Sequence, residues 1–221
     1  MNLLTQTGDG SNTLFNEKIG ENYHSKHGAL QESQHVFIQS GLVPVLENKS
    51  SIQLLEVGFG TGLNFLLTLE ECSRKKVSLN YTALEPFPLE LEQLDRLDYK
   101  QYVNVETWNT FIENYNPSLL STQNFGDEHS LTVKNNKLEE YESDVKFDLI
   151  YFDAFSVRHQ PELWTDEIID KTCNLLKPGG IFVTYAITGK LKRAVKAAGC
   201  TIEKLPGAPG KREMLRATKT L

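Results

Sequence analysis

The chain has 221 residues, of which 39% are hydrophobic and 24% charged, and it carries a formal net charge of −6. This composition is that of an ordinary globular protein. It excludes wholesale disorder, collagen-like repeats and a protein that coats nucleic acid, although it is compatible with a local basic patch. At roughly 150 residues per domain, the length allows one large domain or two small ones.

Cysteines, histidines and hydropathy narrow the class of protein further. Cys72, Cys173 and Cys200 form no CxxC pair, which is typical of a reduced intracellular protein. The five histidines show no paired ligand spacing, so we expect no metal. No apolar run approaches the ~18 residues of a membrane span, and the N-terminal segment lacks the pattern of a signal peptide. We therefore expect a soluble, cytoplasmic protein.

The first part of the chain is predicted to form a short extension. A turn signal at 7–11 predicts a terminal hairpin, and apolar residues at near-helical spacing predict a helix over 29–47 that Pro44 bends or ends. We therefore assign residues 1–48 to an N-terminal extension packed on the core, and residues 49–221 to the main domain.

The main domain alternates strands and helices. Strands are predicted at 52–57, 79–84, 131–133, 146–153 and 181–186, and helices at 63–69, 88–97, 161–176 and 190–198. Residues 98–129 are rich in Asn, Pro, Ser and Gly and are predicted to be an insertion on the rim of the sheet. A final hairpin joins 201–205 to 213–218. The alternation predicts an α/β fold, a doubly wound, mostly parallel sheet with an antiparallel edge hairpin.

Glycines alternate directly after the strand predicted at 52–57. The run reads Glu56-Val57-Gly58-Phe59-Gly60-Thr61-Gly62 and opens the next helix. Missing Cβ atoms let a ligand approach the backbone, and the first N–H groups of the helix can hold an anion or polar ligand. A dinucleotide site would need GxGxxG and a P-loop would need Gly-Lys-Ser/Thr, whereas Leu63 follows Gly62 here. The pattern instead resembles the first motif of class I S-adenosylmethionine (SAM)-dependent methyltransferases, which implies that Glu56 faces the methionine end of the cofactor.

Acidic residues end two of the predicted strands. Glu85 follows the second strand, where a carboxylate can accept both ribose hydroxyls of a nucleoside cofactor. Asn135 and Asn136 follow the third strand, and they are our candidates for the adenine contact. Asp153 ends the most apolar strand, and a carboxylate there is costly unless it is solvated or used. Next to an amine nucleophile, this carboxylate could orient the amine and accept its proton.

Four segments together resemble one family. They are 23–37, with Tyr23, His24 and Glu32; 54–65, with the glycine run and Asn64; 153–165, beginning Asp153-Ala154-Phe155; and 207–217, with Gly210-Lys211-Arg212. In this order they resemble the MnmC-like methyltransferases, including the stand-alone form often called MnmD. The resemblance spans nearly the whole chain and implies a class I, Rossmann-like methyltransferase domain.

The resemblance implies a reaction. The family transfers methyl from SAM to the primary amine of 5-aminomethyl-2-thiouridine at the wobble position, in the anticodon region of tRNA. In that family the aspartate matching Asp153 sits by the substrate amine. Glu56, Gly58, Gly60, Gly62, Asn64 and Glu85 would then hold SAM. Some members carry a fused flavin oxidase domain, for which we expect no room in this chain.

A basic C-terminal end fits an RNA partner. Residues 189–221 hold nine basic and two acidic side chains, a net charge of +7, which leaves −13 on the rest of the chain. Such a segment predicts contacts with phosphates, although a solvated helix face would have the same composition. The candidates for substrate or RNA binding are Tyr23, His24, Arg158, Lys192, Arg193, Lys211 and Arg212. Tyr23 and His24 would line the site, although a lone histidine is as often structural.

Two other functions compete with this hypothesis. An enzyme acting on a free small amine, such as an aminopropyltransferase, would share the fold and would have a deep acidic pocket. A non-catalytic SAM- or RNA-binding module would also share the fold, but the intact Asp153 argues against it. The sequence does not predict the oligomeric state.

Overall fold

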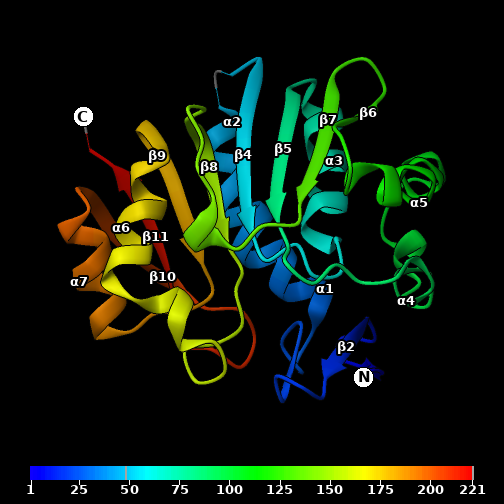
Figure 1. Ribbon diagram of the computed structural model, residues 1–221, viewed down its shortest axis with the longest axis horizontal. Coiled ribbons are helices and arrows are strands. Elements are labelled where there is room, and N and C mark those ends of the chain that lie inside the picture. The colour runs from blue at the N-terminus through cyan, green and yellow to red at the C-terminus, as the bar shows by residue number, and fades with distance from the viewer. Residues whose placement is uncertain (48, 221) are drawn as a thin grey trace.

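A central eight-stranded sheet organises the computed structural model, which describes residues 1–47 and 49–220 (Figure 1). The strand order is β10-β11-β9-β8-β4-β5-β7-β6. The five middle strands are parallel, namely β9 (Leu176–Thr184), β8 (Phe147–Phe152), β4 (Ser51–Val57), β5 (Ser78–Leu84) and β7 (His129–Lys134). The edges are antiparallel, with β11 (Glu213–Lys219) and β10 (Cys200–Pro206) on one side and β6 (Gln123–Phe125) on the other. The predicted fold class is confirmed.

Helices cover both faces of the sheet. One face packs against α3 (Leu63–Lys75), α5 (Val105–Ser118) and η1 (Ser33–Leu42), a helix with π-type hydrogen bonds. The other packs against α6 (Asp166–Asn174) and α7 (Gly189–Ala197). Every residue of β8 is buried because alternate side chains enter the two apolar cores: Leu149 enters one and Ile150 the other. This double burial explains the continuous apolar run of β8.

The N-terminal extension forms a hairpin and a helix, as predicted. A small antiparallel sheet contains β1 (Asn2–Gln6), β2 (Asn12–Asn16) and β3 (Glu21–Asn22), and in Figure 1 it lies below the carboxyl ends of the parallel strands. The helical segment runs through α1 (Ala29–Glu32), η1 and α2 (Val43–Leu46). Pro44 lies in α2, and the helix ends at Leu46. The proposed boundary at residue 48 lies outside the described residues and stays a prediction.

The expected insertion at 98–129 is wrong. After the short helices α4 (Leu91–Asp95) and η2 (Tyr99–Gln101), this segment forms α5, whose Trp108, Phe111 and Tyr115 are buried at i, i+3 and i+7. The Asn104 side chain caps the helix by accepting the N–H of Glu106. These signals are masked by five Asn residues and Pro117 in the same segment. The segment is therefore the helical crossover between two strands of the sheet.

The regions around two further boundaries also differ from the prediction. The helix expected at 161–176 is split into η4 (Pro161–Trp164) and α6, because the Thr165 side chain accepts the N–H of Ile168 and starts a new helix. The segment 177–180, which separates the predicted helix at 161–176 from the predicted strand at 181–186, belongs to β9, where the pairing with β8 shifts register. η3 (Leu138–Glu140) lies in the connection from β7 to β8, and its Leu138 packs in the same apolar core as α6 and α7.

Two absences concern the described residues only. Across 1–47 and 49–220, no helix is both long and apolar enough to cross a bilayer. In the same part of the chain, no group of three or more His, Cys, Asp or Glu side chains is arranged to hold a metal ion.

Candidate active site

A large cavity opens at the point where the order of successive strands in the sheet reverses. β5 and β7 follow on one side of β4, whereas β9 follows β8 on the other side. The carboxyl ends of strands at such a switch point are the usual ligand site of doubly wound sheets. Here a cavity of about 1090 Å³ is lined by the loops after β4, β5 and β8 and by the N-terminal extension.

The glycine loop after β4 forms one wall of this cavity. Gly58 has a φ of 88°, and a Cβ on it would lie 2.5 Å from the backbone oxygen of Asp153. Gly60 has a φ of 53° and lies under the ring of Tyr23. Gly62, with a φ of 76°, starts α3 against the rings of Phe59 and Phe111. Gly58 and Gly60 therefore expose backbone to the cavity, whereas Gly62 only makes the turn.

Glu85 is bound to the glycine loop. One carboxylate oxygen accepts the N–H of Gly60 at 3.0 Å, and the other accepts the N–H of Phe87 at 3.0 Å. Burial raises the pKa of Glu85, and these two hydrogen bonds act against that rise. Each carboxylate oxygen has a second lone pair, so the group can still accept two hydroxyl groups from a ligand.

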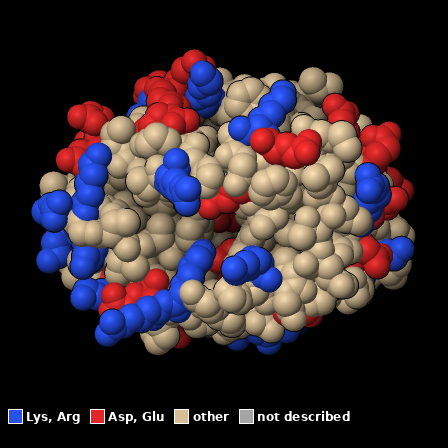
Figure 2. All heavy atoms as spheres, turned by 90° about the horizontal axis from the view of Figure 1, so that it is seen from below, with Lys and Arg blue, Asp and Glu red and all other residues tan. Residues whose placement is uncertain are grey.

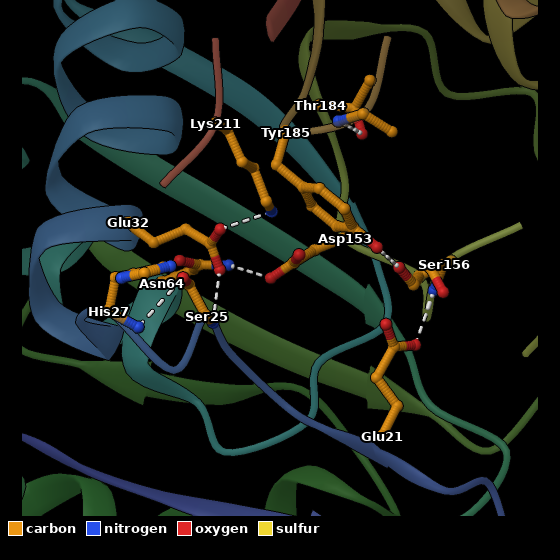
Figure 3. Close-up of polar contacts among 12 residues, drawn as sticks. Glu21, Ser25, His27, Glu32, Asn64, Asp153, Ser156, Thr184, Tyr185 and Lys211 are labelled. Atoms are coloured by element: carbon orange, nitrogen blue, oxygen red, sulfur yellow. Dashed lines mark hydrogen bonds and ion pairs between the residues drawn. The ribbon is translucent and has the colours of Figure 1, made fainter. Parts of the chain in front are cut away.

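Asp153 meets Glu56 through Asn64. The Asn64 amide nitrogen donates to Asp153 Oδ2 at 2.8 Å and to Glu56 Oε1 at 2.8 Å (Figure 3 shows Asn64 and Asp153). The other oxygen of Glu56 accepts the hydroxyl of Tyr81 at 2.8 Å. Glu56 is fully buried, and burial together with the Asp153 charge raises its pKa well above the usual range. Glu56 thus lies behind Asn64 rather than in the cavity lining.

Charged neighbours set the proton affinity of Asp153. Burial, with the Glu32 carboxylate as a second cause, raises the pKa of Asp153 to about 8, whereas Asn64 and the Lys211 ammonium act in the opposite direction. Lys211 donates to Glu32 at 2.6 Å and lies 3.6 Å from the centre of the Tyr185 ring. The Tyr185 hydroxyl donates to the backbone oxygen of Ala154, so the whole group surrounds the end of β8 (Figure 3).

The N-terminal extension forms the roof of the cavity. The Tyr23 ring contacts the ring of Phe155 edge-on, with centroids 5.1 Å apart. Glu21 accepts the N–H of Ser156, and the His159 ring bonds the backbone oxygen of Ile19 (Figure 3 shows Glu21 and Ser156). The loop that follows Asp153 is therefore held against the extension.

His24 joins this roof to the glycine loop. Its ring nitrogens lie 2.9 Å from the Thr13 hydroxyl and 3.4 Å from the Thr61 hydroxyl. Burial lowers the pKa of His24 to about 4, so the ring is neutral at physiological pH. This arrangement is that of a structural histidine that also lines the cavity.

The structure brings only some of the predicted residues together. Those that line the cavity are Gly58, Gly60, Asn64, Glu85, Asn136, Asp153, Tyr23, His24 and Lys211. Those outside the lining are Glu56, Gly62, Asn135, Arg158, Lys192, Arg193 and Arg212. Arg212 lines a shallow hollow next to the cavity, which it shares with Tyr185 and Lys211.

Sequence reasoning missed two residues of this site. Tyr185 directly follows β9 and reaches the cavity, so the rule that pointed to Asp153 could also have found it. Glu32 is buried in α1, lines the cavity, and pairs there with Lys211 from the turn between β10 and β11. No local pattern signals that contact.

The cavity lining is acidic. Seven carboxyl groups and four lysines line it, and the carboxyl groups are Glu21, Glu32, Glu85, Glu90, Glu139, Asp153 and Glu162. Figure 2 views the molecule from the carboxyl ends of the strands and shows acidic atoms in a central hollow. Lys and Arg side chains stand around it and gather on the side that carries α6 and α7. The site therefore favours a cationic ligand in the hollow and anionic groups outside it.

The fold and the glycine loop define the class of protein. A crystal structure of MNMC2 from Aquifex aeolicus superimposes with a TM-score of 0.81 at 23% identity, covering 100% of this chain and 71% of that one. This likeness shows a class I methyltransferase fold. A family model described as S-adenosyl-L-methionine-dependent methyltransferase matches residues 103–220. The chain belongs to that family.

Curated relatives are similar over most of this chain. The bifunctional protein MnmC of tRNA 5-methylaminomethyl-2-thiouridine biosynthesis from Leptospira borgpetersenii is 29% identical over 215 residues, which cover 92% of this chain and 33% of the relative. The protein of the same name from Magnetococcus marinus is 31% identical, over 92% of this chain and 32% of its own length. The chain thus spans about a third of the length of the curated relatives it matches.

Proposed function

We propose that this methyltransferase transfers the methyl group of SAM to the primary amine of 5-aminomethyl(-2-thio)uridine at the wobble position of tRNA, in the cytoplasm. The single observation that carries the proposal is Asp153, a carboxyl group at the switch point, next to the glycine loop and in a cavity of about 1090 Å³. That volume is slightly above the roughly 300–1,000 Å³ of small-molecule sites, so it can admit both a nucleoside cofactor and a target nucleoside.

The cavity residues fit the cofactor. The exposed backbone of Gly58 and Gly60 lets a ligand approach closely, and Glu85 has free lone pairs for ribose hydroxyls. Asn136 lies further along the lining, where we propose the adenine contact. When bound, SAM supplies a methyl group that its sulfonium activates for attack by the lone pair of the amine.

Asp153 would prepare the amine. An alkylammonium has a pKa near 10.4 and must lose a proton before its nitrogen has a lone pair. For an ordinary Asp, with a pKa of 3.8, accepting this proton would be uphill by about 9 kcal/mol, whereas at a pKa of about 8 the figure is about 3 kcal/mol. The raised pKa of Asp153 therefore suits it to accept the proton and to hold the amine in line.

Nucleoside analysis and one variant test the proposal. In a strain that lacks this protein, mass spectrometry of tRNA should show the unmethylated aminomethyl nucleoside in place of the methylated one. In vitro, Asp153→Asn should bind SAM with unchanged affinity but transfer methyl about 10²–10⁴-fold more slowly. Unchanged turnover of Asp153→Asn would reject the role of Asp153, and unchanged tRNA nucleosides would reject the substrate.

The acidic lining favours a second candidate, a methyl- or aminopropyltransferase acting on a free small amine. Seven carboxyl groups against four lysines would attract a polyamine as well as an aminomethyl group. The purified protein should be offered undermodified tRNA and free diamines in parallel with labelled SAM. Labelling of tRNA alone supports the first function, and labelling of a diamine alone supports the second.

A further inference from the structure

The amide of Asn64 is an unusual junction, because one neutral side chain binds two carboxyl groups. Asn64 is the second residue of α3, and the turn at Gly62 brings it to the ends of β4 and β8. Its nitrogen donates both hydrogens, one to Glu56 and one to Asp153, each at 2.8 Å. An amide nitrogen satisfies both groups without adding a charge, whereas a carboxylate would repel them and a hydroxyl has a single hydrogen.

The same amide leaves its oxygen without a partner. Among the described residues, Asn64 Oδ1 is buried and accepts no hydrogen bond. The exposed fraction of the whole residue is 4%, so the oxygen lies away from bulk solvent. A buried acceptor without a partner destabilises the fold. Stability alone would not select this side chain, so we look for its role in the acids that it binds.

We propose that Asn64 is a positioning residue that ties Asp153 to Glu56 and so aims the free oxygen of Asp153, Oδ1, at the substrate amine. This rests on the proposed role of Asp153. Because Oδ2 is engaged by Asn64, the carboxyl group cannot rotate without losing that hydrogen bond. The base is then held in one orientation while the amine is brought into line for attack.

Several charged and titratable groups surround Asp153, and of these Glu32, Asn64 and Lys211 act on its pKa. Glu56 and Tyr81 lie behind Asn64, Tyr185 and the Lys211–Glu32 pair lie at the other side, and Glu21 lies in the roof. Of these contacts, the hydrogen bond from Asn64 favours the ionised form of Asp153 directly. Removing it must therefore raise the pKa of Asp153 further, and methyl transfer should need a higher pH.

Two variants of Asn64 and one control separate positioning from packing. Asn64→Leu keeps the size of the side chain but removes both hydrogen bonds, and Asn64→Ser keeps one donor. Thr68→Val is the matched control, because Thr68 lies one turn further along α3, is fully buried, and hydrogen-bonds the Tyr151 hydroxyl outside the cavity. Each variant is compared with the wild type in thermal unfolding, SAM affinity, and the pH dependence of methyl transfer under single-turnover conditions.

We expect the wild-type rate to rise with pH through a midpoint set by Asp153. Asn64→Leu should shift that midpoint upward by about one unit and slow transfer about tenfold at pH 7, with partial recovery at high pH. The midpoint and the rate of Asn64→Ser should lie between those of the wild type and those of Asn64→Leu. Thr68→Val should lower the unfolding temperature without moving the midpoint. A carbon-13 NMR titration of the Asp153 carboxyl in the ligand-free protein should show the same upward shift in Asn64→Leu.

Three outcomes would overturn the inference. The midpoint of Asn64→Leu could be unchanged while its SAM affinity falls, which would make Asn64 a cofactor ligand only. Its activity could fall at every pH by one factor, together with its unfolding temperature, which would make it a packing residue. Its NMR titration could match that of the wild type. Each of these outcomes rejects the role of Asn64 but not the role of Asp153 in methyl transfer. Normal turnover of Asp153→Asn, in contrast, would reject the role of Asp153 itself. Failure of the inference and failure of the proposed function are therefore distinguishable.

Discussion

Gly58 shows how a single residue decides the geometry of the site. The backbone of Asp153 approaches it closely, since Asp153 donates its N–H to Val57 at 2.9 Å and its carbonyl oxygen lies where a Cβ of residue 58 would stand. The φ of 88° adds a second reason for glycine. The closeness of β4 and β8 at their ends is what sets Asp153 next to the glycine loop.

Replacing Gly58 should therefore damage the site as well as the fold. Gly58→Ala should destabilise the protein by about 2–4 kcal/mol, as the sum of left-handed strain and a backbone clash, and should reduce methyl transfer. Gly10→Ala is the matched control, because Gly10 has nearly the same φ, 86°, with no atom within 4 Å of its added Cβ. We expect about 1 kcal/mol from Gly10→Ala and normal activity. Urea unfolding of both variants gives the comparison, and equal losses would contradict the clash.

At the element scale, the opposite end of the sheet is tied by one buried acid. Asp148 of β8 accepts the N–H of Gln53 in β4 at 2.8 Å, Lys177 of β9 at 2.7 Å and Lys49 at 2.6 Å. Burial would raise the pKa of Asp148, but these hydrogen bonds outweigh burial and lower it. Three adjacent parallel strands, β9, β8 and β4, thus share one carboxylate at the end of the sheet away from the cavity.

The lowered pKa of Asp148 predicts how the free energy of unfolding depends on pH. A carboxyl group whose pKa is lower in the folded than in the unfolded protein stabilises the fold above the unfolded pKa, here 3.8, and loses this effect as pH falls below it. Asp148→Asn should reduce the free energy of unfolding by about 1–3 kcal/mol at pH 7, a range reduced because both lysines are partly exposed. This difference should shrink between pH 4 and pH 2. Asp98→Asn, which breaks the exposed pair with Lys100, is the control and should have little effect at any pH.

At the scale of the whole molecule, charge is divided between the cavity and its surroundings. The hollow is acidic, whereas residues 189–221 carry a net charge of +7. The predicted RNA contacts that lie outside the cavity, Arg158, Lys192, Arg193 and Arg212, are partly or fully exposed. An acidic hollow beside a basic C-terminal segment suits a polyanion that inserts one cationic side group, as the proposed tRNA substrate would.

The salt dependence of tRNA binding tests whether the basic segment contacts the phosphates of the RNA. The double variant Lys192→Ala/Arg193→Ala should weaken tRNA binding, and the slope of log affinity against log salt should fall by about 1–2, because each lost phosphate contact removes about 0.7–0.9. The affinity for SAM should not change. Lys75→Ala at the far end of α3 is the control. A slope equal to that of the wild type would mean that α7 does not face the RNA.

Local sequence predicted the α/β class, the glycine turn and the strand-end positions of Glu85 and Asp153. It could do so because these features depend on short-range patterns: apolar runs, glycine spacing and the rule that ligands meet strand ends. It mistook α5 for an insertion, because polar residues hid the apolar stripe of Trp108, Phe111 and Tyr115.

Only the tertiary structure decided which side chains meet around Asp153. Glu32 and Lys211 are 179 residues apart and form one ion pair, and Asn64 and Asp153 are 89 residues apart and share a hydrogen bond. Such contacts depend on strand order and on the packing of the extension over the sheet, for which short-range patterns carry no signal. The amino-acid sequence by itself thus determined which chemical groups the site can draw on, and folding determined their distances, their burial and therefore their proton affinities.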